Sequence, residues 1–468
     1  MLRRRLLLAL TLALAACGGT PRPAPAAVKV APRDPDGPHR VAVAAQVQPF
    51  LDVELTPALV IGLYDQGKRE IYGFGRVGTG PDAGPPTGTT LFEIGSITKV
   101  FTALLLADAA QAKQVELDQP LADLLPPGVP APTLGGAAIT LRQLALHSAG
   151  LPRLPPSLIP RAADPDPYAG YGEDQLYADL VATALQDPPG TRIVYSNFGA
   201  GLLGHVLGKK LGGGYAQALT TRVLRPLGLA GTYLGFPPRA ARAQGTSDDL
   251  QPVPPWTFDA LAGAGALVSN AQDMLALIDA ELDAAAGGKT PLRAPMRLTQ
   301  ETQLDQAGEN VGLGWQVDAL GRYWHNGGTG GFHAFVGFDP RTRRGVVILA
   351  ASATSVLDRL ARPLYMILDG AQIAPLVMPA ASDLAALAGT YDFLKDKLAV
   401  VARGRRLYIE GPGEPRQRLL PMSSREFLLE GLQALVVFER DEGQPATAPA
   451  ARMVFTVRGQ RLVATRVP

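Results

Sequence analysis

A strongly apolar segment extends from Leu91 to Ala110, with the sequence LFEIGSITKVFTALLLADAA. From Val100 onward, apolar side chains would fall on nearly every face of a helix, and a helix that is apolar all round is buried. Gly95 comes just before Ser96 and loosens the backbone at the start of the run. The pattern predicts a central core helix with Ser96 at its N-terminal end.

Runs of β-type residues stand on both sides of a helical stretch. Residues 57–76 form two such runs about a polar turn at 65–68, which predicts a hairpin. Helix-type segments follow, and β-type runs then return at 311–317, 323–325, 333–338 and 346–351, before a closing helix at 357–368. The order of strands, helices and strands predicts an α+β fold, with an antiparallel sheet flanked by helices and an all-helical insertion.

The pattern changes again from about Pro379. Short β-type runs such as LAVVAR, RLYIE and ALVVFER are separated by turns rich in glycine, proline and charge. This spacing predicts a separate all-β domain over residues 376–468, either a small barrel or a sandwich. The preceding domain is expected to cover residues 46–375.

Composition limits the classes of protein that the chain can belong to. It has 468 residues, of which 47% are hydrophobic and 18% charged, and its formal net charge is +2. The apolar content is sufficient for packed cores and excludes disorder of the whole chain. The balanced charge gives no indication of a nucleic-acid partner or of a membrane surface held by electrostatics.

The N-terminus has the pattern of an export signal. Arg3, Arg4 and Arg5 precede a short apolar run at 6–13, which is too short to span a bilayer. Leu14-Ala15-Ala16-Cys17 then resembles the lipobox of a bacterial lipoprotein, and Cys17 is the only cysteine of the chain. We expect a signal peptide over 1–17 with lipidation of Cys17; the alternative is an ordinary secretory signal.

Both interpretations place the protein outside the cytoplasm. With lipidation it would be a periplasmic or cell-surface lipoprotein anchored to a bacterial membrane. Residues 18–45 are rich in proline and alanine, which indicates a tether between the membrane and the folded part.

Ser96 and Lys99 are candidates for nucleophilic chemistry. Residues three apart are neighbours on a helix surface, so the Lys99 amine can reach the Ser96 hydroxyl. A serine becomes a nucleophile when a base lies beside it, and lysine can act as that base once burial or a nearby cation disfavours its charged form. The alternative is a serine that only caps the helix.

Two later segments strengthen the catalytic interpretation. Tyr195-Ser196-Asn197 lies in a loop before a helical run, where side chains can project into a cleft. His325-Asn326-Gly327-Gly328 ends a β-type run, and its glycines let a substrate lie close to the backbone. Each segment is uninformative alone, but the order S-x-x-K, Y-x-N, H-x-G is specific.

These motifs resemble those of serine β-lactamases and penicillin-binding proteins, in the class C β-lactamase-like branch. The resemblance covers about residues 46–370. The segments LFEIGSITKV, VELDQPLADLLPPG and ITLRQLALHSAGLP resemble AmpH-type serine hydrolases, a kind of D-alanyl-D-alanine carboxypeptidase/endopeptidase. More weakly, the all-β segment is similar to the lipocalin-like domain that follows some relatives.

The resemblance implies a role for each matching residue. Ser96 would attack a carbonyl and form an acyl-enzyme, and Lys99 and Tyr195 would share the general-base and general-acid work, with Lys99 as the cation that favours a tyrosine anion. Asn197 would hold Lys99 and the substrate amide. The backbone N–H groups of Ser96 and Gly328 would form an oxyanion hole.

His325 and Gly327 would line the third side of the site. The relatives carry Lys-Thr/Ser-Gly where this chain has His325-Asn326-Gly327, and a histidine is largely neutral at pH 7. The change weakens the case for recognition of a substrate carboxylate. His147 is interpreted as structural. The other histidines, His39, His205 and His333, lack metal-ligand spacing, so neither a metal nor a cofactor is expected.

The sequence thus predicts a serine hydrolase acting on D-amino-acid peptides of the peptidoglycan type or on β-lactams. A carboxylesterase or D-aminopeptidase using the same site is the second hypothesis. A binding protein that holds penicillin or cell-wall peptides without turnover is the third, and the presence of Ser96, Lys99 and Tyr195 together argues against it. The oligomeric state is left open.

Overall fold

The computed structural model describes residues 37–78, 83–301, 304–306, 309–414, 416–445, 447–457 and 459–467. The expected signal peptide at 1–17, with Cys17, and residues 18–36 of the expected tether lie outside the described residues. Helix α1, Arg40–Asp52, contains the last part of the expected tether, 40–45. That part is helical because Val43, Val47 and Phe50 recur at helical spacing and are buried.

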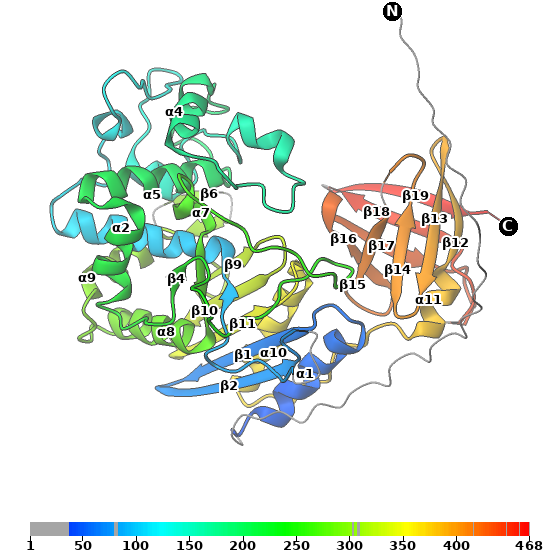
Figure 1. Ribbon diagram of the computed structural model, residues 1–468. Coiled ribbons are helices and arrows are strands. Elements are labelled where there is room, and N and C mark those ends of the chain that lie inside the picture. The colour runs from blue at the N-terminus through cyan, green and yellow to red at the C-terminus, as the bar shows by residue number, and fades with distance from the viewer. Residues whose placement is uncertain are drawn as a thin grey trace, which may run out of the picture. The chain divides into compact units, whose positions relative to one another are not determined.

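A large antiparallel sheet forms the first part of the fold, with strand order β2-β1-β11-β10-β9-β8-β7-β6 (Figure 1). The predicted hairpin is confirmed, since β1 and β2 pair from Ala58↔Gly75 to Asp65↔Lys68. The strands of this sheet are β1 Ala58–Asp65, β2 Lys68–Gly75, β6 Leu304–Gln306, β7 Glu309–Val311, β8 Gln316–Val317, β9 Tyr323–Gly328, β10 His333–Asp339 and β11 Arg344–Ala350.

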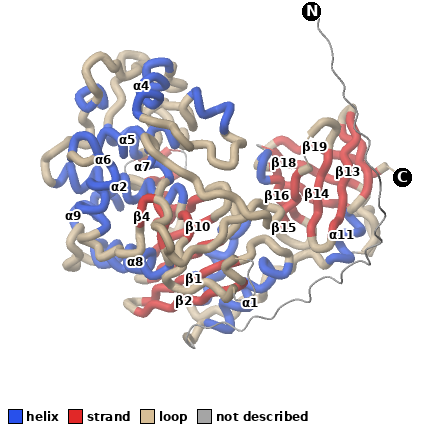
Figure 2. The backbone as a smooth tube through the Cα atoms, viewed as in Figure 1, coloured by secondary structure: helices blue, strands red, loops and turns tan. Residues whose placement is uncertain are grey.

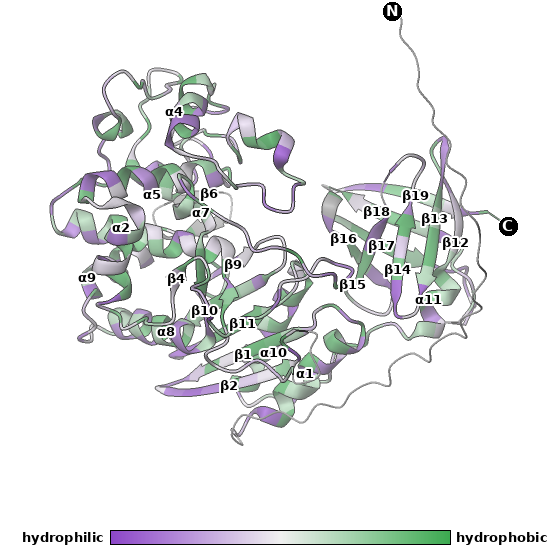
Figure 3. Ribbon diagram, in the orientation of Figure 1, coloured by the Kyte–Doolittle hydropathy of each residue, from purple (hydrophilic) through white to green (hydrophobic). Residues whose placement is uncertain are grey.

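Both faces of this sheet are covered. Alternate residues of a strand face opposite sides, and in β11 Val347 and Leu349 belong to one apolar core while Val346 and Ile348 belong to another. The first core includes helices α2 and α8, and the second includes α1 and α10. Figure 3 shows the resulting apolar character of β10 and β11. The sheet is the middle layer between two sets of helices.

Most helices lie in the predicted insertion between the first and last strands of the sheet. A small sheet of order β3-β5-β4 lies among them. The elements of this region are β3 Phe92–Glu93, η1 Gly95–Ile97, α2 Thr98–Gln111, η2 Leu121–Leu124, α3 Leu141–Ala145, η3 Pro156–Arg161, α4 Glu173–Ala182, α5 Asn197–Leu211, α6 Gly214–Leu219, η4 Thr220–Leu224, β4 Tyr233–Leu234, α7 Ala262–Gly265, β5 Leu267–Ser269, α8 Ala271–Ala285 and α9 Arg293–Gln300. After the sheet come η5 Ser355–Leu360 and α10 Ala361–Leu368.

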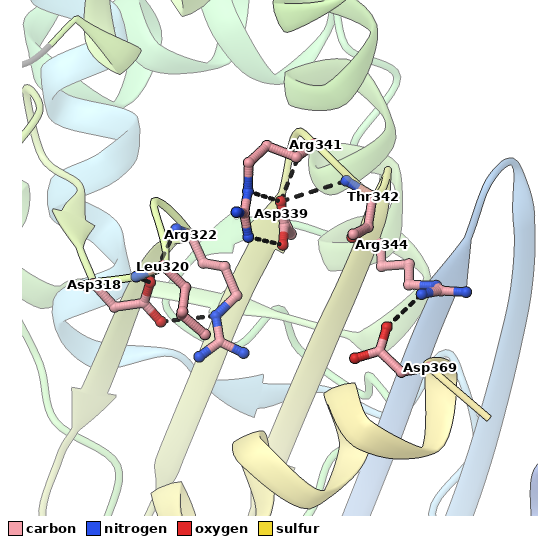
Figure 4. A network of polar contacts seen from close by, with 8 residues as sticks. All are labelled: Asp318, Leu320, Arg322, Asp339, Arg341, Thr342, Arg344 and Asp369. Carbon is pink, nitrogen blue, oxygen red and sulfur yellow. Dashed lines mark hydrogen bonds and ion pairs between the residues drawn. The ribbon is translucent and has the colours of Figure 1, made fainter. Parts of the chain in front are cut away.

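Polar contacts organise the turns at one end of the sheet (Figure 4). Asp339 ends β10 and accepts hydrogen bonds from the backbone N–H groups of Arg341, at 2.9 Å, and Thr342, at 3.4 Å. Before β9, Asp318 accepts a 2.7 Å hydrogen bond from Arg322. Arg344 pairs with Asp369 at the end of α10. These contacts lie at the start of β9, whereas Gly327 and Gly328 lie at its other end.

The C-terminal segment is a closed eight-stranded barrel, β12 to β19 in sequence order (Figure 2). The strands β12 and β19 pair at Tyr391↔Arg466 and close it. Alternate residues of β17, such as Val436 and Phe438, are buried in a core of its own. Of the two predicted alternatives, the barrel is confirmed. Its elements are α11 Ala381–Leu387, β12 Gly389–Phe393, β13 Asp396–Arg403, β14 Arg406–Glu410, β15 Gln417–Pro421, β16 Glu426–Leu429, η6 Glu430–Leu432, β17 Ala434–Glu439, β18 Arg452–Val457 and β19 Gln460–Arg466.

No helix in the described part of the chain combines the length and the apolar character that crossing a membrane requires.

Candidate active site

Ser96 lies in the 3₁₀ turn η1, directly before the core helix α2. Eleven of the fourteen residues of α2 are buried, as the sequence predicts, and they fix this helix in the core. The Lys99 side chain returns along the first turn and places its Nζ 2.8 Å from the Ser96 Oγ. The predicted pairing of Ser96 with Lys99 is therefore present in the structure.

The amine of Lys99 has a second partner, the carbonyl oxygen of Ala264 in α7, at 2.7 Å. Two threonines of α2 hold this segment in place. Thr102 donates a 2.8 Å hydrogen bond to the Gly263 carbonyl, and Thr98 accepts one of 3.1 Å from the Leu267 backbone N–H. These threonines lie on either side of Lys99 in the sequence. Their hydrogen bonds therefore hold the Ala264 carbonyl next to the Lys99 amine.

Burial controls the charge of Lys99. Its side chain is only 3% exposed. Loss of solvent lowers the pKa of this amine well below its usual range, and the nearby charge of Arg153 lowers it further. Both effects favour a neutral amine, which can accept the proton of Ser96.

Tyr195 stands beside the same pair of groups. Lys99 Nζ lies 4.8 Å from the centroid of its ring. Burial raises the pKa of the Tyr195 phenol to about 12, although hydrogen bonding with Ser96 and the charge of Arg153 act against this rise. The sequence suggested that a Lys99 cation would favour a tyrosine anion. The structure instead favours a neutral Lys99 and a protonated Tyr195, because burial dominates the pKa of both groups.

The loop that carries Tyr195 is fastened to His147. The Val194 N–H donates a 2.8 Å hydrogen bond to the His147 carbonyl, and the Ser196 N–H donates one of 3.1 Å to the His147 ring nitrogen Nδ1. Burial is the main cause that lowers the pKa of His147 to about 3, which leaves Nδ1 free to accept. These contacts agree with the interpretation of His147 as a structural residue.

Asn197 opens helix α5 beside Tyr195. Its side-chain nitrogen donates a 2.8 Å hydrogen bond to the Tyr168 hydroxyl. Its Oδ1 is buried, and no hydrogen-bond partner for it is found among the described residues. The expected contact with Lys99 is not among the hydrogen bonds of the described residues, because the Ala264 carbonyl takes that place. The free Oδ1 is an acceptor for a substrate N–H.

Strand β9 supplies the third segment. His325 is 3% exposed, and its Nδ1 lies 2.5 Å from the Asn326 carbonyl oxygen. Burial first, and then the nearby Lys99, lowers the pKa of His325 to about 4. Asn326 donates a 2.7 Å hydrogen bond to Asp358, which also lies 2.7 Å from His333 Nε2. This strand end therefore has a neutral histidine and a nearby carboxylate instead of a lysine.

The backbone of β9 lies directly against the turn that carries Ser96. A Cβ added to Gly327 would lie 1.9 Å from the Ile94 carbonyl oxygen, and one added to Gly95 would lie 2.8 Å from the Gly328 carbonyl oxygen. Gly95 also has a φ of 47°, in the region that favours glycine. Only glycines permit this approach.

The same approach places the backbones of Ser96 and Gly328 on two closely packed segments. The Thr329 N–H donates to Phe332 across the hairpin. Because N–H groups of successive strand residues point to opposite edges, that of Gly328 points away from β10. The N–H groups of Ser96 and Gly328 are thus suited to an oxyanion.

These segments surround a pocket of about 470 Å³. Ser96, Tyr195, Asn197, Gly327 and Gly328 line it, and His325 is not among its lining residues. The remaining lining residues are Arg153, Leu154, Leu158, Ala162, Pro167, Tyr168, Trp256 and Asn326.

Sequence reasoning missed Arg153, Tyr168, Trp256 and the carbonyl of Ala264. Arg153 follows the Leu-Pro pair after His147, and its place in that stretch was the one available signal. Ala264 contributes a backbone atom, for which no residue type gives a signal. Tyr168 and Trp256 come from long loops, and the fold alone brings them to the pocket.

Comparison with known proteins agrees with this geometry. The family model described as Beta-lactamase matches residues 43–370. The chain is 27% identical over 308 residues to the D-alanyl-D-alanine-carboxypeptidase/endopeptidase AmpH of Escherichia coli K12, which covers 62% of this chain and 78% of that protein. It is 28% identical over 352 residues to a beta-lactamase of Pseudomonas fluorescens, covering 66% and 93%. A class C beta lactamase structure superposes with a TM-score of 0.61 at 25% identity, over 71% of this chain and 98% of that one.

Proposed function

Because the chain belongs to the beta-lactamase family of serine hydrolases, we propose that it forms an acyl-enzyme on Ser96. The substrates would be D-amino-acid peptides of the peptidoglycan type or β-lactams. The observation that carries this proposal is the 2.8 Å contact between Ser96 Oγ and the buried Lys99 amine, at the wall of an open pocket. A protein that only binds its ligand needs no activated nucleophile, which argues against a purely binding function.

The first step would be proton transfer from Ser96 to Lys99. Burial favours the neutral form of Lys99, so its amine can take the proton as Ser96 Oγ attacks the carbonyl carbon. The negative charge that develops on the carbonyl oxygen would be met by the N–H groups of Ser96 and Gly328. Losing one such donor typically costs about 3–4 kcal/mol of transition-state stabilisation.

The second step would be departure of the leaving group. Its nitrogen needs a proton, and the phenol of Tyr195 retains one because burial raises its pKa to about 12. Protonated Lys99 can replace that proton through the short Ser96–Lys99–Tyr195 cluster. The free Oδ1 of Asn197 would accept the N–H of the substrate's acyl amide. Water then hydrolyses the ester on Ser96.

Intact-mass spectrometry of the purified protein mixed with a penicillin tests the proposal. We expect an increase equal to the mass of the penicillin, or consumption of the penicillin without a lasting adduct. Both effects should disappear in Ser96→Ala. A matched control is Ser157→Ala, because Ser157 lies in η3 with its hydroxyl 2.6 Å from Asp179. Reaction in Ser96→Ala, or no reaction of wild type with any acyl probe, would contradict the proposal.

Esters and D-aminoacyl amides are the second candidate substrates on the same residues. The observation in their favour is the neutral, buried His325 in place of a lysine. If penicillin stays intact while an ester or D-aminoacyl amide is hydrolysed in a Ser96-dependent way, this second candidate replaces the first.

For the N-terminus we propose export and lipidation of Cys17, followed by a tether and then by the hydrolase and barrel domains. The support is the sequence pattern at residues 1–17 alone. Metabolic labelling with a fatty-acid analogue should mark the wild-type protein and fail to mark Cys17→Ser.

A further inference from the structure

Arg153 is a pocket residue whose backbone position is fixed by the catalytic loop. Its carbonyl accepts hydrogen bonds from the N–H groups of Asn197, at 2.9 Å, and Phe198, at 3.3 Å. The neighbouring Pro152 carbonyl accepts a 2.7 Å hydrogen bond from the Ser196 hydroxyl. The first turn of α5 therefore holds the backbone of residue 153 next to Tyr195, and this contact does not depend on the side chain at that position.

The side chain of Arg153 is exposed, and its guanidinium reaches across Tyr195. The guanidinium carbon lies 5.2 Å from the centroid of the Tyr195 ring. No ion pair joins Arg153 to a carboxylate within the described ranges of the chain. Its charge is also close enough to Lys99 and Tyr195 to lower the pKa of both. The guanidinium is thus an unneutralised cation beside the reacting groups.

Among the described residues that line this pocket, Arg153 is the only charged one. Strand β9 contributes Asn326, Gly327 and Gly328 to the lining, while His325 is buried and is not a lining residue, and Asn326 is held by Asp358. A substrate carboxylate would find no cation among these lining residues of β9. The positive charge of the pocket comes from the loop after His147 instead.

The residues near Arg153 indicate which groups of a ligand would pack beside its charged group. Leu154, Leu158 and Trp256 line the same pocket. Trp256 packs on Tyr168, with ring centroids 5.3 Å apart. The pocket therefore combines one cation with an apolar and aromatic wall, next to the Ser96 hydroxyl.

We propose that Arg153 is a specificity-determining residue that binds a carboxylate on the substrate close to the carbonyl attacked by Ser96. A guanidinium matches a carboxylate with two parallel hydrogen bonds, and such charge-assisted contacts are the strong ones. The preferred substrate is an acyl compound with this carboxylate and an apolar or aromatic side group. This inference rests on the proposed acyl-enzyme and names the substrate class of that site.

A matched pair of thioesters tests the inference with the full chain. One is the N-benzoyl-glycyl thioester of thioglycolate, and the other is the same compound with the carboxylate replaced by a carboxamide. In each turnover Ser96 Oγ forms an ester, the C–S bond breaks, one thiol is released and water hydrolyses the ester. Thiol release gives kcat and KM for both compounds, and Ser96→Ala gives the background.

Wild type should prefer the carboxylate compound. Arg153→Ala should lower kcat/KM for that compound by about 10- to 100-fold, the usual worth of a charge-assisted contact. It should change kcat/KM for the carboxamide by less than about threefold, and Arg153→Lys should restore part of the preference. The matched control is Arg161→Ala, which removes a guanidinium from η3 that pairs with Asp164 at 3.5 Å and should leave both values unchanged.

Three outcomes would overturn the inference. Wild type could show no preference between the two thioesters. Arg153→Ala could lower kcat/KM equally for both and shift the pH–rate profile of both, which would mean that Arg153 acts through the pKa of Lys99 or Tyr195. Wild type could release no thiol and form no adduct, which would refute the acyl-enzyme proposal itself and the inference with it.

Discussion

At the scale of single residues, the amine of Lys99 carries the chemistry that we propose. Two polar partners hold it, and burial favours its neutral form. A buried ionisable group that the fold keeps uncharged is poised to accept a proton. The reactivity of Ser96 therefore depends on where Lys99 lies and on its burial.

Replacing Lys99 by methionine should separate reactivity from folding. Lys99→Met keeps the length of the side chain and removes the base, so adduct formation should slow by about 10²- to 10⁴-fold, as for loss of a general base. The free energy of unfolding should change by less than about 2 kcal/mol, because an apolar chain suits the buried position. Rapid-quench mass spectrometry and urea unfolding measure the two effects. Lys113→Met, at an exposed position just after the end of α2, is the control and should react normally.

His325 should make the stability of the hydrolase domain depend on pH. Its pKa is about 4 in the folded state, against an ordinary value of 6.5. At pH values between 4 and 6.5, His325 is protonated in the unfolded chain and neutral in the folded chain. Stability is then complete above pH 6.5 and falls as the pH decreases to about 4, by about 3 kcal/mol at 1.36 kcal/mol for each pKa unit.

His325→Gln should remove this part of the pH dependence. Urea unfolding at a series of pH values, followed by tryptophan fluorescence, measures it. The three tryptophans, Trp256, Trp315 and Trp324, all lie before residue 376, so the fluorescence comes from residues of the hydrolase domain. An equal decline in wild type and variant between pH 6.5 and 4 would show that the folded state does protonate His325.

At the scale of elements, the decisive contact is that of strand β9 with the turn before α2. Two glycines allow it, one on each element, so the proposed oxyanion hole is made by backbone groups alone. The geometry of this oxyanion hole depends on the distance between the two elements. Side chains at other positions do not change that distance directly.

Gly327→Ala should disrupt the site by separating these elements. The new Cβ would lie 1.9 Å from the Ile94 carbonyl and 2.8 Å from the Ser96 nitrogen, so β9 must move. We expect a loss of about 1–3 kcal/mol in stability and a roughly 100-fold or greater loss of adduct formation. Gly328→Ala is the control for stability, because its nearest contact would be His333 Nδ1 at 4.0 Å. Similar melting temperatures for the two variants would contradict this account.

The elements also show which parts of the site a sequence can predict. The core helix and the Ser96–Lys99 contact depend on positions three apart in the chain, so a local pattern contains them. Tyr195 and the end of β9 were found because each stands in a short motif. The carbonyl of Ala264 joins the site through its hydrogen bond from Lys99, and Arg153 is held there by hydrogen bonds that its backbone carbonyl accepts from α5. Both are long-range contacts, which no local pattern encodes.

At the scale of the whole molecule, the chain combines a region of the beta-lactamase family, residues 43–370, with a closed C-terminal barrel. The sheet, its two helical layers and the all-β C-terminal segment follow from the hydrophobic pattern, and the sequence predicted them. It did not decide between barrel and sandwich, because that choice depends on the pairing of β12 with β19, the first and last strands. It also missed α1, whose alanine-rich sequence resembles the tether.

Residues 376–468 should fold on their own. A closed barrel leaves no strand without a partner, and this one has its own buried core. The isolated segment should give the circular dichroism of a β protein and a single cooperative thermal transition. This segment contains no tryptophan, so its unfolding in the full chain can be distinguished from that of the hydrolase domain by tryptophan fluorescence. Gradual melting, or binding of a dye that detects exposed apolar surface, would show that the barrel requires the rest of the chain.

The separation between the backbone and the side chain of residue 153 has a consequence for how this protein can change. The carbonyl that supports α5 is present in every amino acid, so laboratory evolution can vary the side chain there without dismantling the catalytic loop. A library of variants at this single position would place acidic, neutral or basic side chains beside the pocket and leave the nucleophile unchanged. Preference for charged or uncharged substrates could therefore diverge among descendants that keep the same reaction.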